Sequence, residues 1–303
     1  MMNRPVPSGA ARADAPGCPF PLKGIDLHLH STFSDGLKTP EQLCAMAVKA
    51  GVSHLSLCDH DTAAGVPAMQ KAAQAAGLVC YAGAELSTGP GGRIHILCYG
   101  EGVLGQQAAA YLAQVEHERK YRAERILQKL EEMGLTMEAE ERRALLEQPS
   151  VGRAHIARAL IAMGVVNTMQ QAFDRYLGEG RPAYVPRMQL STMEAVRTLR
   201  DMHVLPVLAH PMRMQMDFPA MHAFIRALVK EGLMGMECFH PSANARAARV
   251  LKHMARQENL LVTGGSDYHG DKGSSAHIGR LPSGWNSREA DIDAFENALI
   301  HIR

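Results

Sequence analysis

Short apolar segments that end in histidine or acidic residues recur along this chain of 303 residues, and stretches with helical periodicity lie between them. We expect seven strands, at residues 24–30, 54–58, 78–84, 93–99, 204–209, 233–238 and 260–263. We expect helices around them at residues 40–51, 66–76, 192–202, 218–231, 243–257 and 287–299. Strands that alternate with helices build an α/β fold. Polar residues at the carboxyl ends of strands are typical of the active-site face of a (β/α) barrel.

The alternation is interrupted at residues 104–187, which are charged, helical in pattern and without a clear strand. Within them the sequence predicts helices at residues 108–133, 154–163 and 169–177. Ile126, Leu127 and Leu130 recur with helical spacing, so we interpret this stretch as an inserted helical subdomain rather than a linker. The flanking α/β domain would then consist of residues 23–103 and 188–303.

Composition argues against several functional classes. The formal net charge is +1, which does not indicate a general nucleic-acid-binding surface, and no run of 18 apolar residues predicts a membrane span. Residues 1–22 are rich in Pro, Ala, Gly and Ser and lack an apolar core, so we expect a disordered tail rather than a signal peptide. The six cysteines are scattered without a CxxC pair, which favours reduced thiols in a cytoplasmic protein over disulfides or a thiolate zinc site.

The first predicted strand reads Gly24-Ile25-Asp26-Leu27-His28-Leu29-His30. Its period of two puts His28 and His30 on one face and the aliphatic side chains on the other. Two imidazoles placed in this way can reach one metal ion. A half-buried strand with incidental histidines would show the same pattern, so this segment alone leaves both interpretations open.

Later strands carry the same chemistry, which makes the metal interpretation harder to dismiss. Five strands end in histidine, aspartate or glutamate, and a sixth contains a histidine: the residues are His28 and His30, Asp59 and His60, Glu85, His95, His210, and Asp267 with His269. Imidazole and carboxylate ligands without thiolates suit manganese, iron or zinc. One ion does not need this many ligands. We therefore expect a centre with two or three divalent ions. Such centres hydrolyse phosphate esters.

These residues resemble the motifs of the polymerase-and-histidinol-phosphatase (PHP) superfamily. The matching motifs are His28-Leu29-His30, Asp59-His60-Asp61, His210-Pro211 and Ser266-Asp267-Tyr268-His269. They occur in the family's order, and the resemblance covers roughly residues 24–100 and 190–280. It implies a distorted (β/α)7 barrel, in agreement with the seven strands predicted above.

The resemblance also implies how the ligands divide among three ions. His28, His30, Glu85 and Asp267 would hold the first ion, and Glu85 would bridge to a second ion held with His95 and His210. The third ion would be held by Asp35, His60 and His269. Asp26 and Asp59 would orient ligand histidines from behind.

The insertion resembles that of the PHP branch that acts on nucleoside 3′,5′-bisphosphates or on 5′-phosphorylated oligonucleotides. The resembling residues are Ser150-Val151-Gly152-Arg153-Ala154-His155 and Gly180-Arg181-Pro182-Ala183-Tyr184-Val185. We expect Arg153, His155 and Arg181 to contact phosphate, since guanidinium groups bind phosphate through paired hydrogen bonds. Asp267 and His155 are the expected catalytic residues, with His155 as a proton donor to the leaving oxygen. Arg119 and Arg122 are weaker candidates, and surface ion pairs are the competing explanation for all these arginines.

We therefore expect a metal-dependent phosphoesterase whose partner is a small nucleotide or short oligonucleotide, without a membrane or a stable nucleic-acid complex. Two alternatives stay open at this point. One is a histidinol-phosphate phosphatase of the same superfamily, although a small amino alcohol phosphate does not obviously need the insertion. The other is a catalytically silent metal-binding module, whose signature would be lost ligands, and no ligand position is lost here.

Overall fold

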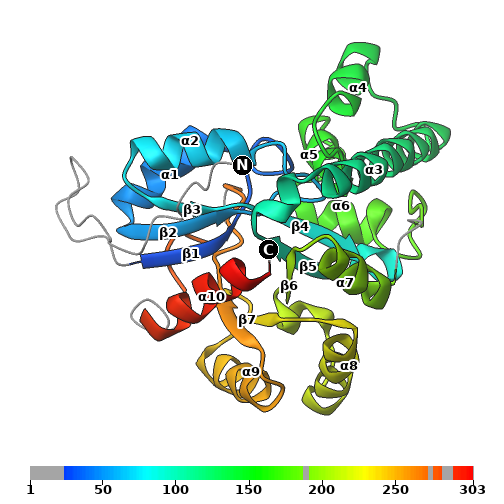
Figure 1. Ribbon diagram of the computed structural model, residues 1–303. Helices are drawn as coiled ribbons and strands as arrows, with labels where there is room; N and C mark the ends of the chain where they lie inside the picture. Colours follow the sequence, from blue (N-terminus) through cyan, green and yellow to red (C-terminus); the bar gives the residue numbers. More distant parts are fainter. Residues whose placement is uncertain (1–23, 187–190, 272–275, 282–288, 303) are drawn as a thin grey trace.

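The computed structural model describes residues 24–186, 191–271, 276–281 and 289–302, so the tail expected at residues 1–22 lies outside the described residues. The fold is mixed α/β (Figure 1). Within the described ranges the strands are β1 (Gly24–Leu29), β2 (Val52–Leu57), β3 (Val79–Tyr81), β4 (Gly83–Thr88), β5 (Ile94–Tyr99), β6 (Leu205–Leu208), β7 (Gly235–Phe239) and β8 (Leu261–Gly264). They form a three-stranded sheet in the order β1-β2-β3 and a five-stranded sheet in the order β4-β5-β6-β7-β8.

The helices largely follow the predicted pattern. They are α1 (Pro40–Lys49), α2 (Val66–Ala75), α3 (Gln106–Glu132), α4 (Ala139–Leu146), α5 (Arg153–Ala162), α6 (Met169–Ala172), α7 (Thr192–Asp201), α8 (Phe218–Glu231), α9 (Ala245–Gln257) and α10 (Glu289–His301). Helix α1 begins with the expected capping box, in which Thr39 and Gln42 each accept a backbone hydrogen bond from the other. Helix α4 was not predicted. No helix in the described part of the chain combines the length and the apolar composition that a membrane-spanning helix needs.

One predicted strand, at residues 78–84, is divided in the structure. β3 pairs in parallel with β2, whereas β4 leaves that sheet and pairs antiparallel with β5. Gly83 lies at the division, where a Cβ atom would come within 2.4 Å of the Ser56 hydroxyl, so only glycine fits there. The chain therefore has eight strands in its described part instead of seven. Glu85, expected at a strand end, lies inside β4.

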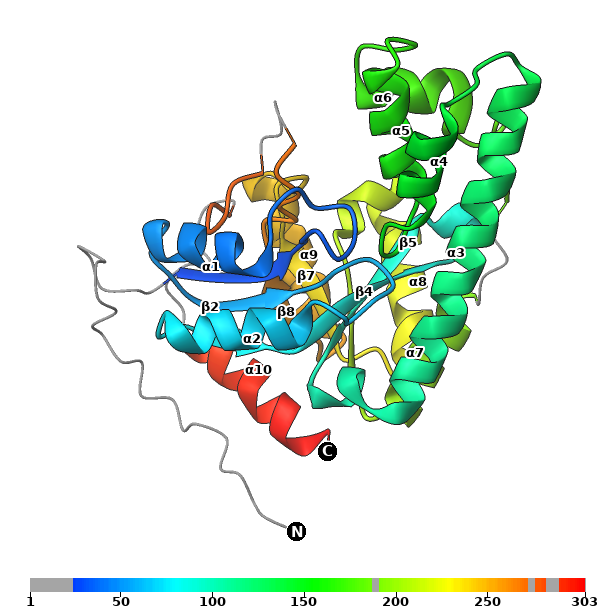
Figure 2. The same cartoon turned by 90° about the horizontal axis from the view of Figure 1, so that it is seen from above.

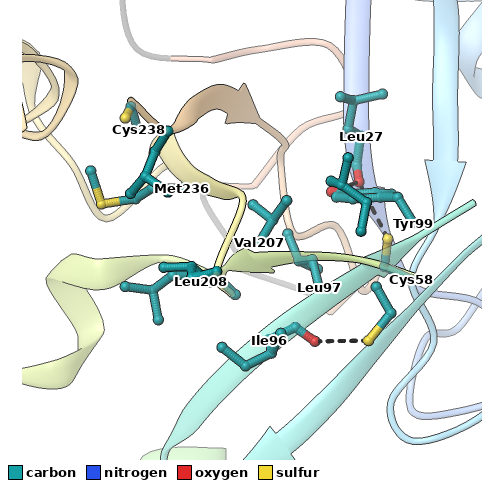
Figure 3. Close-up of a cluster of buried hydrophobic side chains, with 14 of the residues drawn as sticks. Leu27, Cys58, Ile96, Leu97, Tyr99, Val207, Leu208, Met236 and Cys238 are labelled. Carbon is teal, nitrogen blue, oxygen red and sulfur yellow. Dashed lines mark hydrogen bonds between the residues drawn. The ribbon is translucent and has the colours of Figure 1, made fainter. Parts of the chain in front are cut away.

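The two sheets enclose a shared apolar interior. Leu27 of β1 meets Leu97 and Tyr99 of β5 and Val207 of β6 (Figure 3). The Tyr99 hydroxyl donates a hydrogen bond of 2.8 Å to the carbonyl of Leu27, which links the sheets across the interior. Backbone bridges also join the sheets, between Leu29 and Tyr268 and between His60 and Glu85. These bridges bring the residues that follow β1, β2 and β8 to one end of the molecule.

Helices α3 to α6 pack together as a group at one side of the sheets (Figure 2). They share a hydrophobic cluster of their own, built around Ile126, Leu127, Ile156 and Leu160. Every residue of this cluster comes from residues 123–185. The predicted helix at residues 169–177 is helical throughout but changes type. It is α-helical in α6 and π-helical at Phe173–Leu177.

Candidate metal centre

Strand β1 and the residue directly after it supply the first two imidazoles of the site. The alternating pattern puts His28 and His30 on the same side, where both are fully buried, and their Nε2 atoms lie 3.0 Å apart. This distance fits an N–H···N hydrogen bond between the rings, and it is also short enough for both nitrogens to bind one ion when neither carries a proton. That arrangement is what one bound ion requires of two histidine ligands.

Glu85 lies at the centre of the arrangement. Its Oε1 atom is 2.9 Å from Nδ1 of His95 and 2.9 Å from Nε2 of His210, and its Oε2 atom is 2.9 Å from Nδ1 of His60. Burial opposes ionisation of Glu85, but the surrounding imidazoles of His95, His60 and His28 lower its pKa well below the usual range. A buried, ionised carboxylate is thus held between two groups of histidines.

A second set of side chains lies on the loops that follow β1, β2 and β8. Nε2 of His269 is 3.2 Å from one oxygen of Asp35, and Nε2 of His60 is 3.9 Å from the other. The rings of His30 and His269 stack with centroids 4.0 Å apart, which joins this set to the β1 histidines. Burial would lower the pKa of His269, but Asp35 and Asp267 raise it to about 10.

Asp267 closes the arrangement from the end of β8. Its Oδ1 atom is 3.1 Å from Nε2 of His30, and its Oδ2 atom is 2.9 Å from the Arg213 guanidinium. Its backbone N–H donates to the carbonyl of His28, and its φ of 52° is unusual for a residue other than glycine. The chain therefore holds this aspartate in a demanding conformation beside β1.

The nine residues predicted as ligands are thus brought together, and the chemistry of the set suits divalent ions. The described residues form three groups whose ligand atoms all lie within 4.8 Å of one another: His28, His30, Glu85 and Asp267; His30, Asp35, His60 and His269; and His60, Glu85 and His95. Four buried atoms of the set make no hydrogen bond in the described structure: Nδ1 of His30, Oδ1 of Asp35, Nδ1 of His60 and Oε2 of Glu85. Three of them lie within 3.2 Å of another member of the set without hydrogen-bond geometry, and such clustered, poorly satisfied atoms fit the bonding needs of ions.

The histidines of the set differ in protonation: against the effect of burial, neighbouring carboxylates raise the pKa of His28, His60 and His269, whereas two other imidazoles are held neutral. Burial lowers the pKa of His30 to about 3 and that of His210 to about 4, so both imidazoles are neutral near pH 7. A neutral imidazole offers a lone pair to an ion, whereas an imidazolium does not. These two histidines are therefore ready to act as ligands without losing a proton.

Sequence reasoning missed two buried residues on and after β7. Glu237 accepts a hydrogen bond of 3.0 Å from Nδ1 of His28 and one of 2.7 Å from the backbone N–H of His210. Nε2 of His240 lies 3.3 Å from Oδ2 of Asp267. The available signals were a lone carboxylate inside an apolar strand and a His-Pro pair just after it, the same pair that follows β6.

The two aspartates expected to orient ligand histidines have a different role. Asp26 accepts from the backbone N–H groups of Ser266 and Gly279, and Asp59 accepts from Ser31 and Ser34. Both carboxylates fix the backbone of the loops around the site and do not contact a ligand ring. Glu237 is the carboxylate that orients His28, because it fixes the Nδ1 proton and leaves Nε2 free to bind.

We expect the Glu237→Gln variant to bind its tightest ion about tenfold more weakly, since removing a carboxylate behind a ligand histidine typically costs about 10–100-fold in metal affinity and glutamine keeps part of the hydrogen bonding. Calorimetric titration of Mn²⁺ into the metal-free protein measures the change in affinity. Glu258→Gln is the control, because Glu258 pairs with His222 away from the site. Unchanged affinity in Glu237→Gln would contradict the orienting role.

A cleft of about 480 Å³ opens onto the predicted ligands and includes Arg213 in its lining. A second cavity of about 150 Å³ adjoins it, since both are lined by Asp35, His60 and His95. Arg119, Arg122 and Arg153 of the insertion line this second cavity together with Phe173. Arginine side chains of the insertion thus line the cavity beside the predicted ligands, and Arg158 of the insertion lines the larger cleft.

The three residues expected to contact phosphate differ in their placement. Arg153 lines the second cavity, donates to the carbonyl of Gly91 and lies over the Phe173 ring at 5.5 Å. His155 is buried with both ring nitrogens engaged: Nε2 donates to the carbonyl of Ser34 at 2.8 Å, and Nδ1 accepts from Gly152 at 3.2 Å. Its expected roles as phosphate ligand and proton donor therefore do not fit this geometry. Arg181 is exposed and is not among the residues that line either cavity.

Comparisons with known proteins relate the whole chain to a family. Residues 26–178 match the sequence model of the PHP domain family. A 5′-3′ exoribonuclease from Haemophilus influenzae is 32% identical over 91% of this chain and 97% of its own length. A 3′,5′-nucleoside bisphosphate phosphatase from Chromobacterium violaceum is 29% identical over 82% of this chain and 88% of its own length.

A solved structure from Bifidobacterium adolescentis, described as that of a metal-dependent phosphoesterase, covers 92% of this chain and 97% of its own with a TM-score of 0.76 and 27% identity. The family match spans half of the chain and includes the strands that carry His28, His30, Glu85 and His95. The chain therefore belongs to the PHP domain family of metal-dependent phosphoesterases.

Proposed function

We propose that this chain hydrolyses a phosphate ester of a small nucleotide, either a nucleoside 3′,5′-bisphosphate or the 5′ end of a short oligonucleotide. The observation that supports the proposal most is the cavity lined by arginines beside the predicted metal ligands. A phosphate in the ligand-lined cleft would leave room for a second phosphate or a neighbouring nucleotide in the adjoining cavity. The relatives named for a bisphosphate phosphatase and for an exoribonuclease act on substrates with that property.

In this proposal the nine predicted ligands hold two or three divalent ions, of manganese, iron or zinc. Ions bound there would lower the pKa of a bound water, so that hydroxide is available near neutral pH. They would also stabilise negative charge on the phosphoryl oxygens. Asp267 is the proposed catalytic carboxylate, since it lines the cleft and its pKa is held well below the usual range by His28, His269 and Arg213 against the effect of burial. Arg213 lies beside it and is half exposed, in position to meet a phosphate oxygen.

The arginines of the insertion provide the proposed second set of contacts. Arg153 and Arg122 line the adjoining cavity on the side of the insertion, and the Phe173 ring beneath Arg153 offers a flat apolar surface. Guanidinium groups bind phosphate with directional, charge-assisted hydrogen bonds. Arg153 and Arg122 would thus hold the part of the substrate that is not cleaved.

We further propose that the two sheets are halves of a distorted barrel, formed by residues 23–103 and 188–303, and that residues 104–187 are a separate inserted subdomain. The backbone bridges between the sheets and the shared interior support the first point. The separate hydrophobic cluster of the insertion supports the second. Cys44, Cys58, Cys80, Cys98 and Cys238 are free thiols, which is compatible with the cytoplasmic location that we propose.

The experiment that tests the function is a phosphate-release screen with Mn²⁺ over nucleoside 3′,5′-bisphosphates, short 5′-phosphorylated RNA and DNA, and histidinol phosphate. We expect release from a bisphosphate or an oligonucleotide, loss of activity after chelation, and recovery when the ion is restored. Release from histidinol phosphate alone would favour the alternative phosphatase. Binding of ions without release from any of these phosphates would identify a silent metal-binding module.

A further inference from the structure

Two segments of the insertion, one in α3 and one around the start of α5, are anchored to the loops that carry two predicted ligands. The residues are Arg119, Ser150 and His155 of the insertion together with Asp61, and we call them the latch. Ser150 donates its hydroxyl proton to the carbonyl of His60, and His155 donates through Nε2 to the carbonyl of Ser34, the residue before Asp35. The latch therefore contacts the backbone at one ligand and immediately before another.

Arg119 and Asp61 form the charged part of the latch. Nη1 of Arg119 lies 2.5 Å from Oδ2 of Asp61, and the Arg119 Nε atom donates to the carbonyls of Ser150 and Val151. Asp61 also accepts from the backbone N–H and the hydroxyl of Ser87 in β4. Its side chain is 1% exposed and that of Arg119 is 11% exposed, so the pair is largely shielded from solvent. A shielded pair with hydrogen bonds on both sides resists separation far better than a surface ion pair.

The backbone at the latch is held in conformations that need such support. Asp61 has a φ of 56° and Ser150 a φ of 48°, which are unfavourable for residues other than glycine. A Cβ atom on Gly152 would come within 2.4 Å of the Arg119 guanidinium, so the chain turns tightly against that side chain. A backbone bridge to Glu85 also holds His60, and Asp59 holds Ser31 and Ser34 beside Asp35, so the latch adds a further set of supports from the side of the insertion.

We propose that the latch of the insertion positions Asp35 and His60 for the ion that they share with His269. Ligands on two loops must be held within a fraction of an ångström to bind one ion well. The other predicted ligands lie on or next to β1, β4, β5, β6 and β8, where backbone pairing fixes them without the insertion. The insertion would thus act most on the ion shared by Asp35, His60 and His269, and would reach the ions around Glu85 only through His60, whose Nδ1 lies 2.9 Å from Oε2 of Glu85. The inference rests on the proposed metal centre.

The test uses the full chain after removal of metal, titrated with Mn²⁺ by calorimetry, with the number of bound ions checked by elemental analysis. In the His155→Ala variant we expect one of three ions to bind at least about tenfold more weakly, with the affinities of the other two unchanged. His155→Gln should recover most of the loss, because its amide can donate to the Ser34 carbonyl. Arg125→Ala, an exposed change on the same helix as Arg119, should bind all three ions as the unmodified chain does.

A second variant keeps the test decisive if His155→Ala does not fold. Ser150→Gly removes the hydroxyl that reaches His60 while accepting the positive φ, so it is expected to fold and to weaken most the ion that His60 shares with Asp35 and His269. Three ions bound with unchanged affinity in both variants would overturn the latch and leave the proposed function standing. Equal weakening of every bound ion in His155→Ala would also overturn the latch, because it would show a general loss of structure, whatever the phosphate-release screen shows.

Discussion

The Glu85→Gln variant is expected to lose at least about 10²–10³-fold in turnover, comparable to the removal of one group that stabilises transition-state charge. Glu85 is fully buried, and its two oxygens lie within 2.9 Å of imidazoles from three different loops and strands. A neutral amide of the same size keeps the packing but removes the negative charge that two divalent ions would share. Metal content measured after dialysis should fall together with turnover.

The control for this variant is Glu101→Gln, an exposed carboxylate whose side chain contacts Gln70. It should keep both metal content and rate. Thermal unfolding of the metal-free proteins separates loss of ligand from loss of fold, since Glu85→Gln is expected to fold. Full metal content with an unmodified rate in Glu85→Gln would remove this residue from the centre.

The pattern of the fold could be predicted because it is local. Alternating residues in β1 determine which side chains share a face, so His28 and His30 could be paired from the sequence. The long helix α3 follows from helical spacing over many residues. The division between β3 and β4 could not be predicted, because it depends on how closely Gly83 approaches Ser56 of a neighbouring strand. A contact between strands leaves no periodic signal in either of them.

The same difference between local patterns and contacts between distant residues explains which parts of the site could be predicted from the sequence. The predicted ligands repeat one signal, a histidine or carboxylate on or just after an apolar strand, and repetition made them recognisable. Glu237 occurs once, inside a buried strand, and its role depends on the neighbouring position of His28. His155 carries a sequence signal similar to that of Arg153, yet its ring points to the Ser34 carbonyl. Side-chain direction in the insertion is set by its packing against the sheets, which sequence spacing does not encode.

The insertion therefore combines two tasks that its sequence does not separate. Ser150 and His155 face the loops that carry predicted ligands, whereas Arg153, between them in the chain, faces the adjoining cavity. Helix α5 begins at Arg153, and its first turn directs these neighbours to different sides. A substitution in this short segment can thus affect ion binding or substrate binding, and measurement of both distinguishes them.

The Arg153→Ala variant is expected to raise the Michaelis constant for a nucleoside 3′,5′-bisphosphate by about tenfold to a hundredfold. A charge-assisted hydrogen bond to phosphate contributes about 1.5–3 kcal/mol, which corresponds to that range. The constant for a nucleoside monophosphate should change much less, because the cleft beside the predicted ligands would hold its single phosphate. Metal content should stay unchanged, since Arg153 is not one of the predicted ligands and its described contacts are with Gly91 and Phe173.

Arg181→Ala is the matched control, because Arg181 belongs to the same insertion but is exposed and lies outside the lining of the cavity. It should leave both constants nearly unchanged. Steady-state kinetics with the two substrates, measured for both variants, gives the comparison. If Arg153→Ala weakens both substrates equally, Arg153 does not read a second phosphate. If Arg181→Ala has the selective effect instead, the second phosphate binds on the outer surface of the insertion, and the cavity beside His60 and His95 loses its proposed role in substrate choice.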